Sequence, residues 1–236
     1  MRWPMVILSK KSAGLLILSV MGMLMFSVFW QGSSAVVSHF GGQHVVMLDP
    51  GHGGYDPGTI TNQGVYEKEI NLQIAQKVRE MLGPSGIKVL LTRDEDIDYV
   101  PNGVKGKQTK KQTDLNRRIE MAKEAQADVF VSLHVNATAS GKQSGAESFY
   151  HYRSESGKSL AEFIQQELIK ITGMNRRIAK PGDFYVINNS SMPAVIVEVG
   201  YLSSPKERQK LQQSWYQEQL SRAIAKGIAN YFEAHN

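Results

Sequence analysis

Short apolar runs alternate along the chain with longer segments in which apolar residues recur at every third or fourth position. Runs of the first kind predict β-strands, and spacing of the second kind predicts amphipathic helices. The predicted strands span residues 44–48, 87–92, 128–133, 147–152, 184–187 and 194–199, and the predicted helices span 67–82, 114–126, 156–172 and 215–232. Residues 147–152 alternate in character, but the other predicted strands are largely apolar and alternate with helices, so we expect an α/β domain whose sheet is covered by helices on both faces.

The first 35 residues have the pattern of an export signal. Arg2, Lys10 and Lys11 precede an uncharged apolar segment, residues 12–30. Positive charge before an apolar core is typical of segments that leave the cytoplasm while their N-terminus stays inside. The apolar segment has nearly the length of a bilayer span, so residues 1–35 are either a cleaved signal peptide or an N-terminal membrane anchor.

The remainder of the chain is predicted to lie outside the cytoplasm. Residues 36–43 are small and polar and are interpreted as a linker, and residues 44–236 as a single domain. The chain has no cysteine, which excludes disulfides and thiolate catalysis. Its formal net charge is +5, and three of these charges belong to residues 1–35, which leaves +2 for the rest. A body so close to neutral does not indicate a nucleic-acid-binding protein.

Lysines are concentrated in one segment, residues 102–113, which contains Lys105, Lys107, Lys110 and Lys111. We interpret it as a solvated loop, with Asp114 capping the helix that follows. The alternative is a surface that touches an acidic polymer or a partner protein.

Four ionisable residues lie in settings that suggest chemistry: His52, Glu67, His134 and Glu198. The glycines around His52 allow unusual dihedral angles at a fixed imidazole. His134 ends an apolar strand, and Glu198 interrupts another, where an unpaired carboxylate is costly to bury. Two imidazoles and a carboxylate can hold zinc with one position open for water, and a second carboxylate can act as a base. Together the four residues predict a metal-dependent hydrolase.

Structural explanations remain open for each residue taken alone. Either histidine could be a hydrogen-bonded residue without a metal. Glu67 opens a predicted helix, where the helix dipole favours an acid. Glu198 could form a buried ion pair with Arg93 or Arg118.

Six ordered motifs resemble those of the zinc-dependent N-acetylmuramoyl-L-alanine amidases. They are Asp49-Pro-Gly-His-Gly-Gly54, Gly64-Val-Tyr-Glu67, Thr92-Arg93, Leu115 with Arg118, Ser132-Leu-His-Val-Asn136 and Glu198-Val-Gly-Tyr-Leu-Ser203. The resemblance covers about residues 44–233. It implies that His52, Glu67 and His134 are the ligands of Zn²⁺, and that Glu198 is the catalytic carboxylate. It also implies a mixed, mostly parallel sheet flanked by helices.

The resemblance implies a substrate as well. Such amidases cut the amide that joins N-acetylmuramic acid to the L-alanine of the stem peptide, so the glycan strand and stem peptide of peptidoglycan are the expected partners. A leader followed by a bare catalytic domain is similar to the germination-specific amidases that act on the spore cortex of endospore-forming bacteria. The chain departs from the family pattern at Val135, where a small residue is usual, and in its longer lysine-rich segment.

Three alternatives accompany this interpretation. The chain could be a zinc peptidase that cuts within the stem peptide, since the same metal chemistry hydrolyses any amide. It could be a peptidoglycan-binding protein without catalysis, although such a protein has no use for a buried base. It could also be an enzyme that stays inactive until an activating protein partner orders its zinc site.

Overall fold

The computed structural model describes residues 44–171, 173 and 176–235 of the chain. The predicted leader (residues 1–35) and linker (residues 36–43) lie outside these described residues. Within the described part, no helix combines the length and the apolar character that crossing a lipid bilayer requires.

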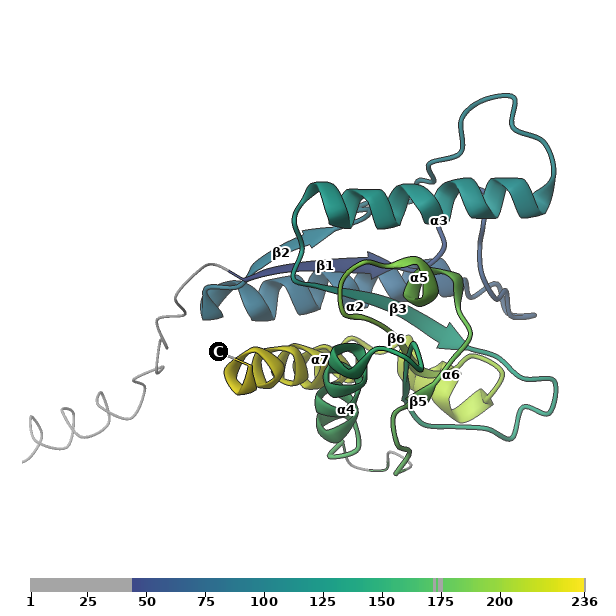
Figure 1. Cartoon of the computed structure of the whole chain (residues 1–236). Helices are drawn as coiled ribbons and strands as arrows, with labels where there is room; N and C mark the ends of the chain where they lie inside the picture. The colour runs from purple at the N-terminus through teal and green to yellow at the C-terminus, as the bar shows by residue number, and fades with distance from the viewer. Residues whose placement is uncertain (1–43, 172, 174–175, 236) are drawn as a thin grey trace, which may run out of the picture. The chain divides into compact units, whose positions relative to one another are not determined.

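A six-stranded sheet forms the centre of the described fold, in the order β2-β1-β3-β6-β4-β5 (Figure 1). Its strands are β1 (Val45–Pro50), β2 (Lys88–Leu91), β3 (Val129–Asn136), β4 (Glu147–Tyr150), β5 (Lys180–Pro181) and β6 (Ala194–Tyr201). Neighbouring strands run parallel, except that β4 is antiparallel to β6. The predicted mixed, mostly parallel sheet is therefore confirmed.

Helices cover both faces of the sheet (Figure 1). One face carries α2 (Glu67–Leu82), α4 (Glu155–Leu168) and α7 (Ser214–Ala234), and the other carries α3 (Lys107–Glu124) and α5 (Tyr185–Asn189). The short helices η1 (Gly83–Ser85) and α6 (Pro205–Leu211) follow α2 and β6. Alternate residues of β3 enter the two cores, Val131 and Leu133 on the α2 side and Phe130 on the α3 side. Burial on both faces explains why the strands are apolar throughout.

The prediction of a strand at residues 184–187 is wrong. Phe184 is extended, but the chain enters α5 at Tyr185. Val186 and Ile187 are buried in the core on the α3 side, and the Phe184 ring packs against Phe149 with centroids 5.1 Å apart. A short apolar run fits either a strand or one buried helical turn, and here the packing selects the turn.

The helix predicted to start at Asp114 begins earlier, at Lys107. Lysine and glutamine are good helix formers, so much of the segment predicted as a loop is helical instead. Asp114 is consequently not a cap. It lies inside α3, is buried, and accepts a hydrogen bond of 2.8 Å from Arg118 Nε.

A buried ion-pair network lies beneath the loop that follows β1. Arg118 Nη1 donates to Asp49 Oδ1 at 2.8 Å, and both side chains are 1% exposed. Asp49 also accepts hydrogen bonds of 2.6 Å from the hydroxyls of Thr92 and Ser132. Burial alone would raise the pKa of Asp49, but Arg118 and the two hydroxyls lower it to about 2. The network ties β1 to β3, to α3 and to the residue that follows β2.

Two buried arginines also hold the backbone of this loop. Arg118 donates to the carbonyl oxygens of Pro50 at 3.0 Å and His52 at 2.7 Å. Arg93 donates to the carbonyl oxygens of Pro50 at 2.9 Å and Gly51 at 3.1 Å. Buried carbonyl oxygens need such partners, and the Gly51 carbonyl also accepts a hydrogen bond of 3.1 Å from Asn71 Nδ2. The arginines therefore fix the path of the loop that carries His52.

Replacing Asp49 by asparagine is expected to destabilise the fold strongly, because it leaves Arg118 buried with less opposing charge. We expect a loss of about 3 kcal/mol in the free energy of unfolding at pH 7, measured by urea denaturation. Since the folded-state pKa of Asp49 is lowered, its contribution is fully present above its ordinary pKa of 3.8 and is lost as the pH falls towards 2. The difference between wild type and variant should shrink over that range.

The matched control is Asp94→Asn, which removes the same charge from an exposed ion pair with Arg79. An exposed pair contributes about 1 kcal/mol or less. Equal urea midpoints for wild type and Asp49→Asn would contradict the role given to the network.

Candidate metal centre

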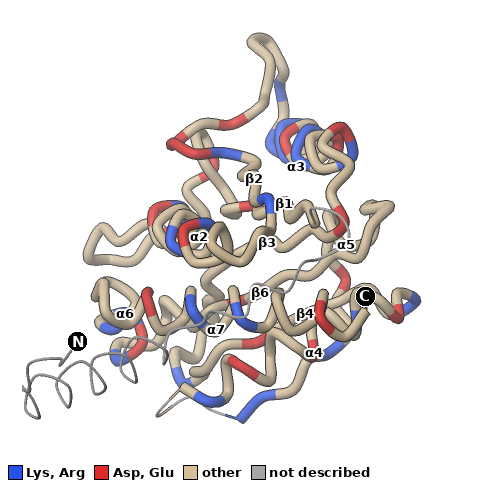
Figure 2. The backbone as a smooth tube through the Cα atoms, turned by 90° about the vertical axis from the view of Figure 1, so that its left-hand side faces the viewer, with Lys and Arg blue, Asp and Glu red and all other residues tan. Residues whose placement is uncertain are grey.

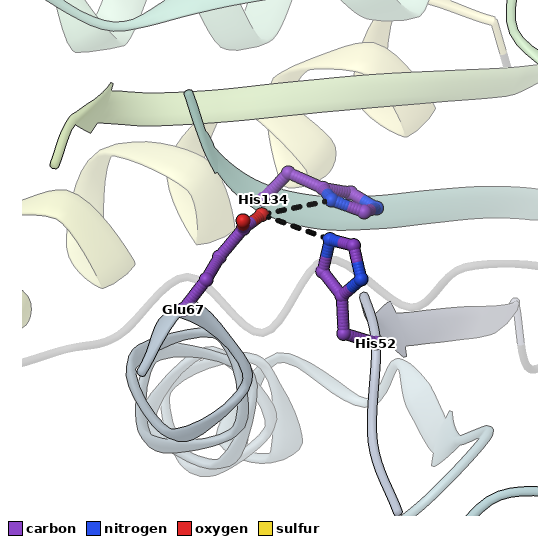
Figure 3. A group of neighbouring side chains, drawn as sticks. All are labelled: His52, Glu67 and His134. Carbon is purple, nitrogen blue, oxygen red and sulfur yellow. Dashed lines mark hydrogen bonds and ion pairs between the residues drawn. The ribbon is translucent and has the colours of Figure 1, made fainter. Parts of the chain in front are cut away.

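Three side chains far apart in sequence meet beyond the carboxyl ends of β1 and β3. His52 lies in the loop after β1, Glu67 is the first residue of α2, and His134 lies near the end of β3. One potential ligand atom from each lies within 4.8 Å of the others. Figure 3 shows both imidazoles directed at the Glu67 carboxylate, whose Oε1 is 3.1 Å from His52 Nε2 and 3.2 Å from His134 Nδ1. These three residues are called the ligand cluster below.

Two glycines make room for this convergence. A Cβ on Gly51 would lie 2.3 Å from ring atoms of His134, and a Cβ on Gly58 would lie 2.7 Å from Glu67 Oε2 and from His52 Cδ2. His52 itself has a positive φ of 65°, which is uncommon outside glycine. The buried arginine contacts described above support this conformation, and the glycine-rich sequence makes the close approach feasible.

A fourth residue, Asp56, orients His52. Asp56 Oδ2 lies 2.8 Å from His52 Nδ1, which leaves Nε2 facing Glu67. Hydrogen bonding of one imidazole nitrogen to a carboxylate is the usual way in which a ligating histidine is fixed. Asp56 was missed in the sequence analysis, and the available signal was an acid four residues after His52 in the same glycine-rich loop.

Backbone amides fix the Glu67 carboxylate from both sides. Thr59 N donates to Oε2 at 2.8 Å, and Val135 N donates to Oε1 at 3.1 Å. Burial alone would raise the pKa of Glu67, but hydrogen bonds from His134 and His52 hold it far below its ordinary value. Glu67 is therefore an ionised acceptor held in one place, as a metal ligand must be.

The charge balance of the ligand cluster fits a cation. Burial would lower the pKa of His52, yet its hydrogen bonds with Asp56 and Glu67 raise that pKa to about 9. His52 therefore holds a proton at neutral pH, which a bound divalent cation would displace. Two imidazole nitrogens and one carboxylate oxygen form a donor set that suits divalent transition metals.

Glu198 lies beside the ligand cluster without a partner of its own. It is in register with His134 across β3 and β6 and is 8% exposed. Its Oε2 is buried and has no hydrogen-bond partner among the described residues. The alternative of an ion pair with an arginine is wrong, because Arg118 pairs with two aspartates and Arg93 hydrogen-bonds to backbone carbonyls.

The surroundings of Glu198 also raise the pKa of its carboxyl group. Burial, followed by the negative charge of Glu67, raises the pKa of Glu198 to about 8. A carboxylate oxygen without a partner is costly to bury. Its position next to the ligand cluster is thus a second, independent sign that a cation and a polar substrate belong here.

The structure brings together all four residues singled out in the sequence. The arrangement combines a three-residue donor set with a separate carboxylate, which is the minimum that a metal-assisted hydrolysis needs. The proximity arises because parallel strands end at a common edge of the sheet, as the positions of His52 and His134 at the ends of predicted strands indicated.

Comparison with known proteins agrees with this geometry. Residues 46–230 match the family model described as N-acetylmuramoyl-L-alanine amidase. The germination-specific N-acetylmuramoyl-L-alanine amidase of Bacillus subtilis is 36% identical over 189 residues, covering 80% of this chain and 79% of the relative. The amidase LytC of the same organism is 37% identical over 189 residues, covering 79% of this chain and 35% of the relative.

A similar fold is known from solved structures. The structure of the CwlD amidase from Clostridioides difficile in complex with the GerS lipoprotein has a TM-score of 0.77 and 37% sequence identity, covering 81% of this chain and 100% of that one. The amidase AmiC2 of Nostoc punctiforme has a TM-score of 0.70 and 33% identity, covering 81% of this chain and 98% of that one.

Replacing Asp56 by asparagine is expected to weaken binding of a divalent cation by about 10- to 100-fold while the fold is kept. The variant loses the carboxylate that holds His52 with Nε2 towards Glu67. Competition with a chelating dye at pH 7 measures the affinity. Asp128→Asn is the matched control, since Asp128 lies 3.7 Å from His44 in a second Asp–His pair outside the cluster. Equal cation affinity for Asp56→Asn and wild type would contradict the orienting role.

Proposed function

The chain belongs to the N-acetylmuramoyl-L-alanine amidase family, and we propose from this premise that it is a zinc-dependent hydrolase of peptidoglycan. The bond cut is the amide between N-acetylmuramic acid and the L-alanine of the stem peptide. One observation carries the proposal beyond family membership. His52, Glu67 and His134 converge within 4.8 Å, next to a buried Glu198 oxygen that has no partner among the described residues.

In this proposal His52, Glu67 and His134 would hold the zinc ion, through the atoms that already face one another, His52 Nε2, a Glu67 oxygen and His134 Nδ1. Zinc in a site of two histidines and a glutamate lowers the pKa of a bound water to about 7 and polarises the substrate carbonyl. The chain's own contribution is to fix two of these donors before zinc binds, His52 through Asp56, and Glu67 through Thr59 N and Val135 N. Such preorganisation removes the need to reorder the ligands during the reaction.

Glu198 is the proposed general base and acid. It takes a proton from the attacking water and then gives it to the departing amine of L-alanine, so that the proton count balances. With a pKa of about 8 it would be protonated at neutral pH, but positive charge at the ligand cluster lowers that pKa. Glu198 is therefore ready to accept a proton when the cation is held, which links cation binding to catalysis.

The cellular role is proposed from the similarity of the chain to its relatives. The similarity to a germination-specific amidase supports action on the spore cortex. We propose that residues 1–35 direct export, either as a cleaved signal peptide or as an anchor through residues 12–30. The CwlD amidase was solved in complex with a lipoprotein, which supports the proposal that this chain also has an activating protein partner.

The test is a product analysis. The full-length chain is incubated with intact peptidoglycan, with added zinc or with a chelator, and the soluble products are identified by mass spectrometry. We expect stem peptides that begin with a free L-alanine amine, released only with zinc. The Glu198→Gln variant should keep its zinc and lose about 10²- to 10⁴-fold in turnover, the usual contribution of a general acid–base.

Other products would select a different function. Fragments cut within the stem peptide would identify a zinc peptidase. Absence of products from a zinc-loaded chain would favour a peptidoglycan-binding protein or an enzyme that requires its partner. Near-normal turnover in Glu198→Gln would remove Glu198 from the mechanism.

A further inference from the structure

Two hollows lie near the ligand cluster and share no lining residue: two residues of the cluster line the first, and the second is adjacent to the cluster through Thr59. The first, called the α3–α5 cavity, has a volume of about 220 Å³ and is lined by His52 and His134 together with residues of α3 and α5. The second, called the loop groove, has a volume of about 450 Å³ and runs between residues 59–62 and 137–141. It begins at Thr59, whose amide holds Glu67. A substrate bound at the cluster can therefore extend into either hollow.

The α3–α5 cavity combines an apolar wall with charge. Leu115, Phe184, Val186 and Ile196 supply the apolar surface. Most of its charged groups already have partners: Asp49 and Asp114 face Arg118, Asp56 faces His52, and Asp183 accepts a 2.6 Å hydrogen bond from the Asn188 amide.

Lys111 is the exception among these charges. It is exposed in the second turn of α3 and lines the cavity, and within residues 44–171, 173 and 176–235 it makes no hydrogen bond or ion pair. Its positive charge acts on Asp56 without direct contact and is the last of the causes that lower the pKa of Asp56. Its neighbour Lys110 instead lies over the Tyr55 ring, 5.6 Å from the centroid. Figure 2 shows several basic positions on α3, but of these lysines and arginines Lys111 and the fully paired Arg118 line the cavity.

The loop groove has a different chemistry. Hydroxyl and amide side chains dominate its lining, namely those of Thr59, Thr61, Asn62, Thr138, Ser140 and Ser203. Its one charged residue, Arg208, donates to the Leu202 carbonyl at 3.1 Å and to Gln63 Oε1 at 3.1 Å. The groove therefore offers neutral hydrogen-bonding groups without an unpaired charge.

The two sides of the proposed substrate differ in charge, as the two hollows do. The scissile amide joins a neutral sugar to a peptide whose residue after L-alanine carries a carboxylate close to the backbone. Resting on the amidase function proposed above, we propose that the stem peptide lies in the α3–α5 cavity with this carboxylate bound by Lys111, while the glycan lies along the loop groove. L-Alanine then contacts the apolar wall. Lys111 is thus a specificity-determining residue that distinguishes an acidic stem from an amidated one.

Two disaccharide muropeptides that differ in one carboxylate test this orientation. Their stems are L-alanyl-D-glutamate and L-alanyl-D-isoglutamine, each with its γ-carboxyl group blocked as an amide, so that they differ only in the α-carboxylate. For the zinc-loaded full-length chain, Lys111→Gln should lower kcat/KM on the carboxylate substrate by about fivefold, mainly through KM, as expected for one exposed ion pair. Its activity on the carboxamide should not change. Lys111→Glu should prefer the carboxamide substrate, which is the reverse of the wild-type preference. Raised salt should reduce the difference in kcat/KM between the two substrates for both proteins.

Lys123→Gln, which removes the same charge from the other end of α3 outside the cavity, should leave both activities as in wild type. Equal loss on both substrates in Lys111→Gln, or no loss on either, would overturn the proposed orientation while leaving the amidase function in place. Release of no peptide from either substrate by the wild type would instead refute the amidase function itself.

Discussion

The ion pair between Arg118 and Asp49 is the interaction on which the candidate site depends. Both side chains are almost completely buried, and their charges compensate each other only in the folded chain. The same guanidinium reaches the carbonyl oxygen of His52 at 2.7 Å. The position of a candidate metal ligand is therefore set by a helix, α3, that contributes no ligand. A site on a glycine-rich loop gains from this arrangement the rigidity that the loop cannot provide itself.

The binding of a cation is linked to the protonation of two groups at the site, His52 and Glu198. Asp56 and Glu67 raise the pKa of His52 to about 9, and the buried negative charge of Glu67 helps to raise that of Glu198 to about 8. Both shifts favour protons at groups that must lose them for hydrolysis. A divalent cation at the ligand cluster reverses both tendencies, because it replaces the proton on His52 and favours the ionised form of Glu198. A cation at the ligand cluster can therefore take the place of the protons that these two groups otherwise hold.

Much of this fold could be predicted from the sequence, and the failures have identifiable causes. The helix at Glu67–Leu82 was predicted with the bounds that the structure has, because its apolar stripe and terminating glycine are unambiguous. The run at residues 184–187 failed because four apolar residues fit two kinds of structure. The start of α3 was missed because its first turns are polar and the stripe of buried residues begins only at Asp114.

The candidate site, like the fold, could be predicted from the sequence only in part. His52, His134 and Glu198 could be named because each is an ionisable group in a sequence setting where such a group is unusual, whereas Glu67, at a helix start where an acid is common, was identified through the family motif that contains it. The spacing of Asp56 four residues after His52 was a weak signal, but the contact itself occurs in a loop where His52 has a positive φ, which the sequence does not specify. Among the described residues Glu198 Oε2 has no hydrogen-bond partner, which is also a tertiary property, because the two arginines considered as its partners, Arg93 and Arg118, are bound elsewhere.

The central claim is that His52, Glu67 and His134 hold zinc through specific atoms, and anomalous diffraction at the zinc absorption edge from crystals of the zinc-loaded chain tests it most directly. The account predicts one strong peak at about 2.0–2.2 Å from His52 Nε2, a Glu67 carboxylate oxygen and His134 Nδ1, as in other zinc sites of this type. Asp56 should keep its contact with His52 Nδ1, and Glu198 should lie beside the peak without binding it. A peak elsewhere, or one bound through His52 Nδ1, would contradict the account.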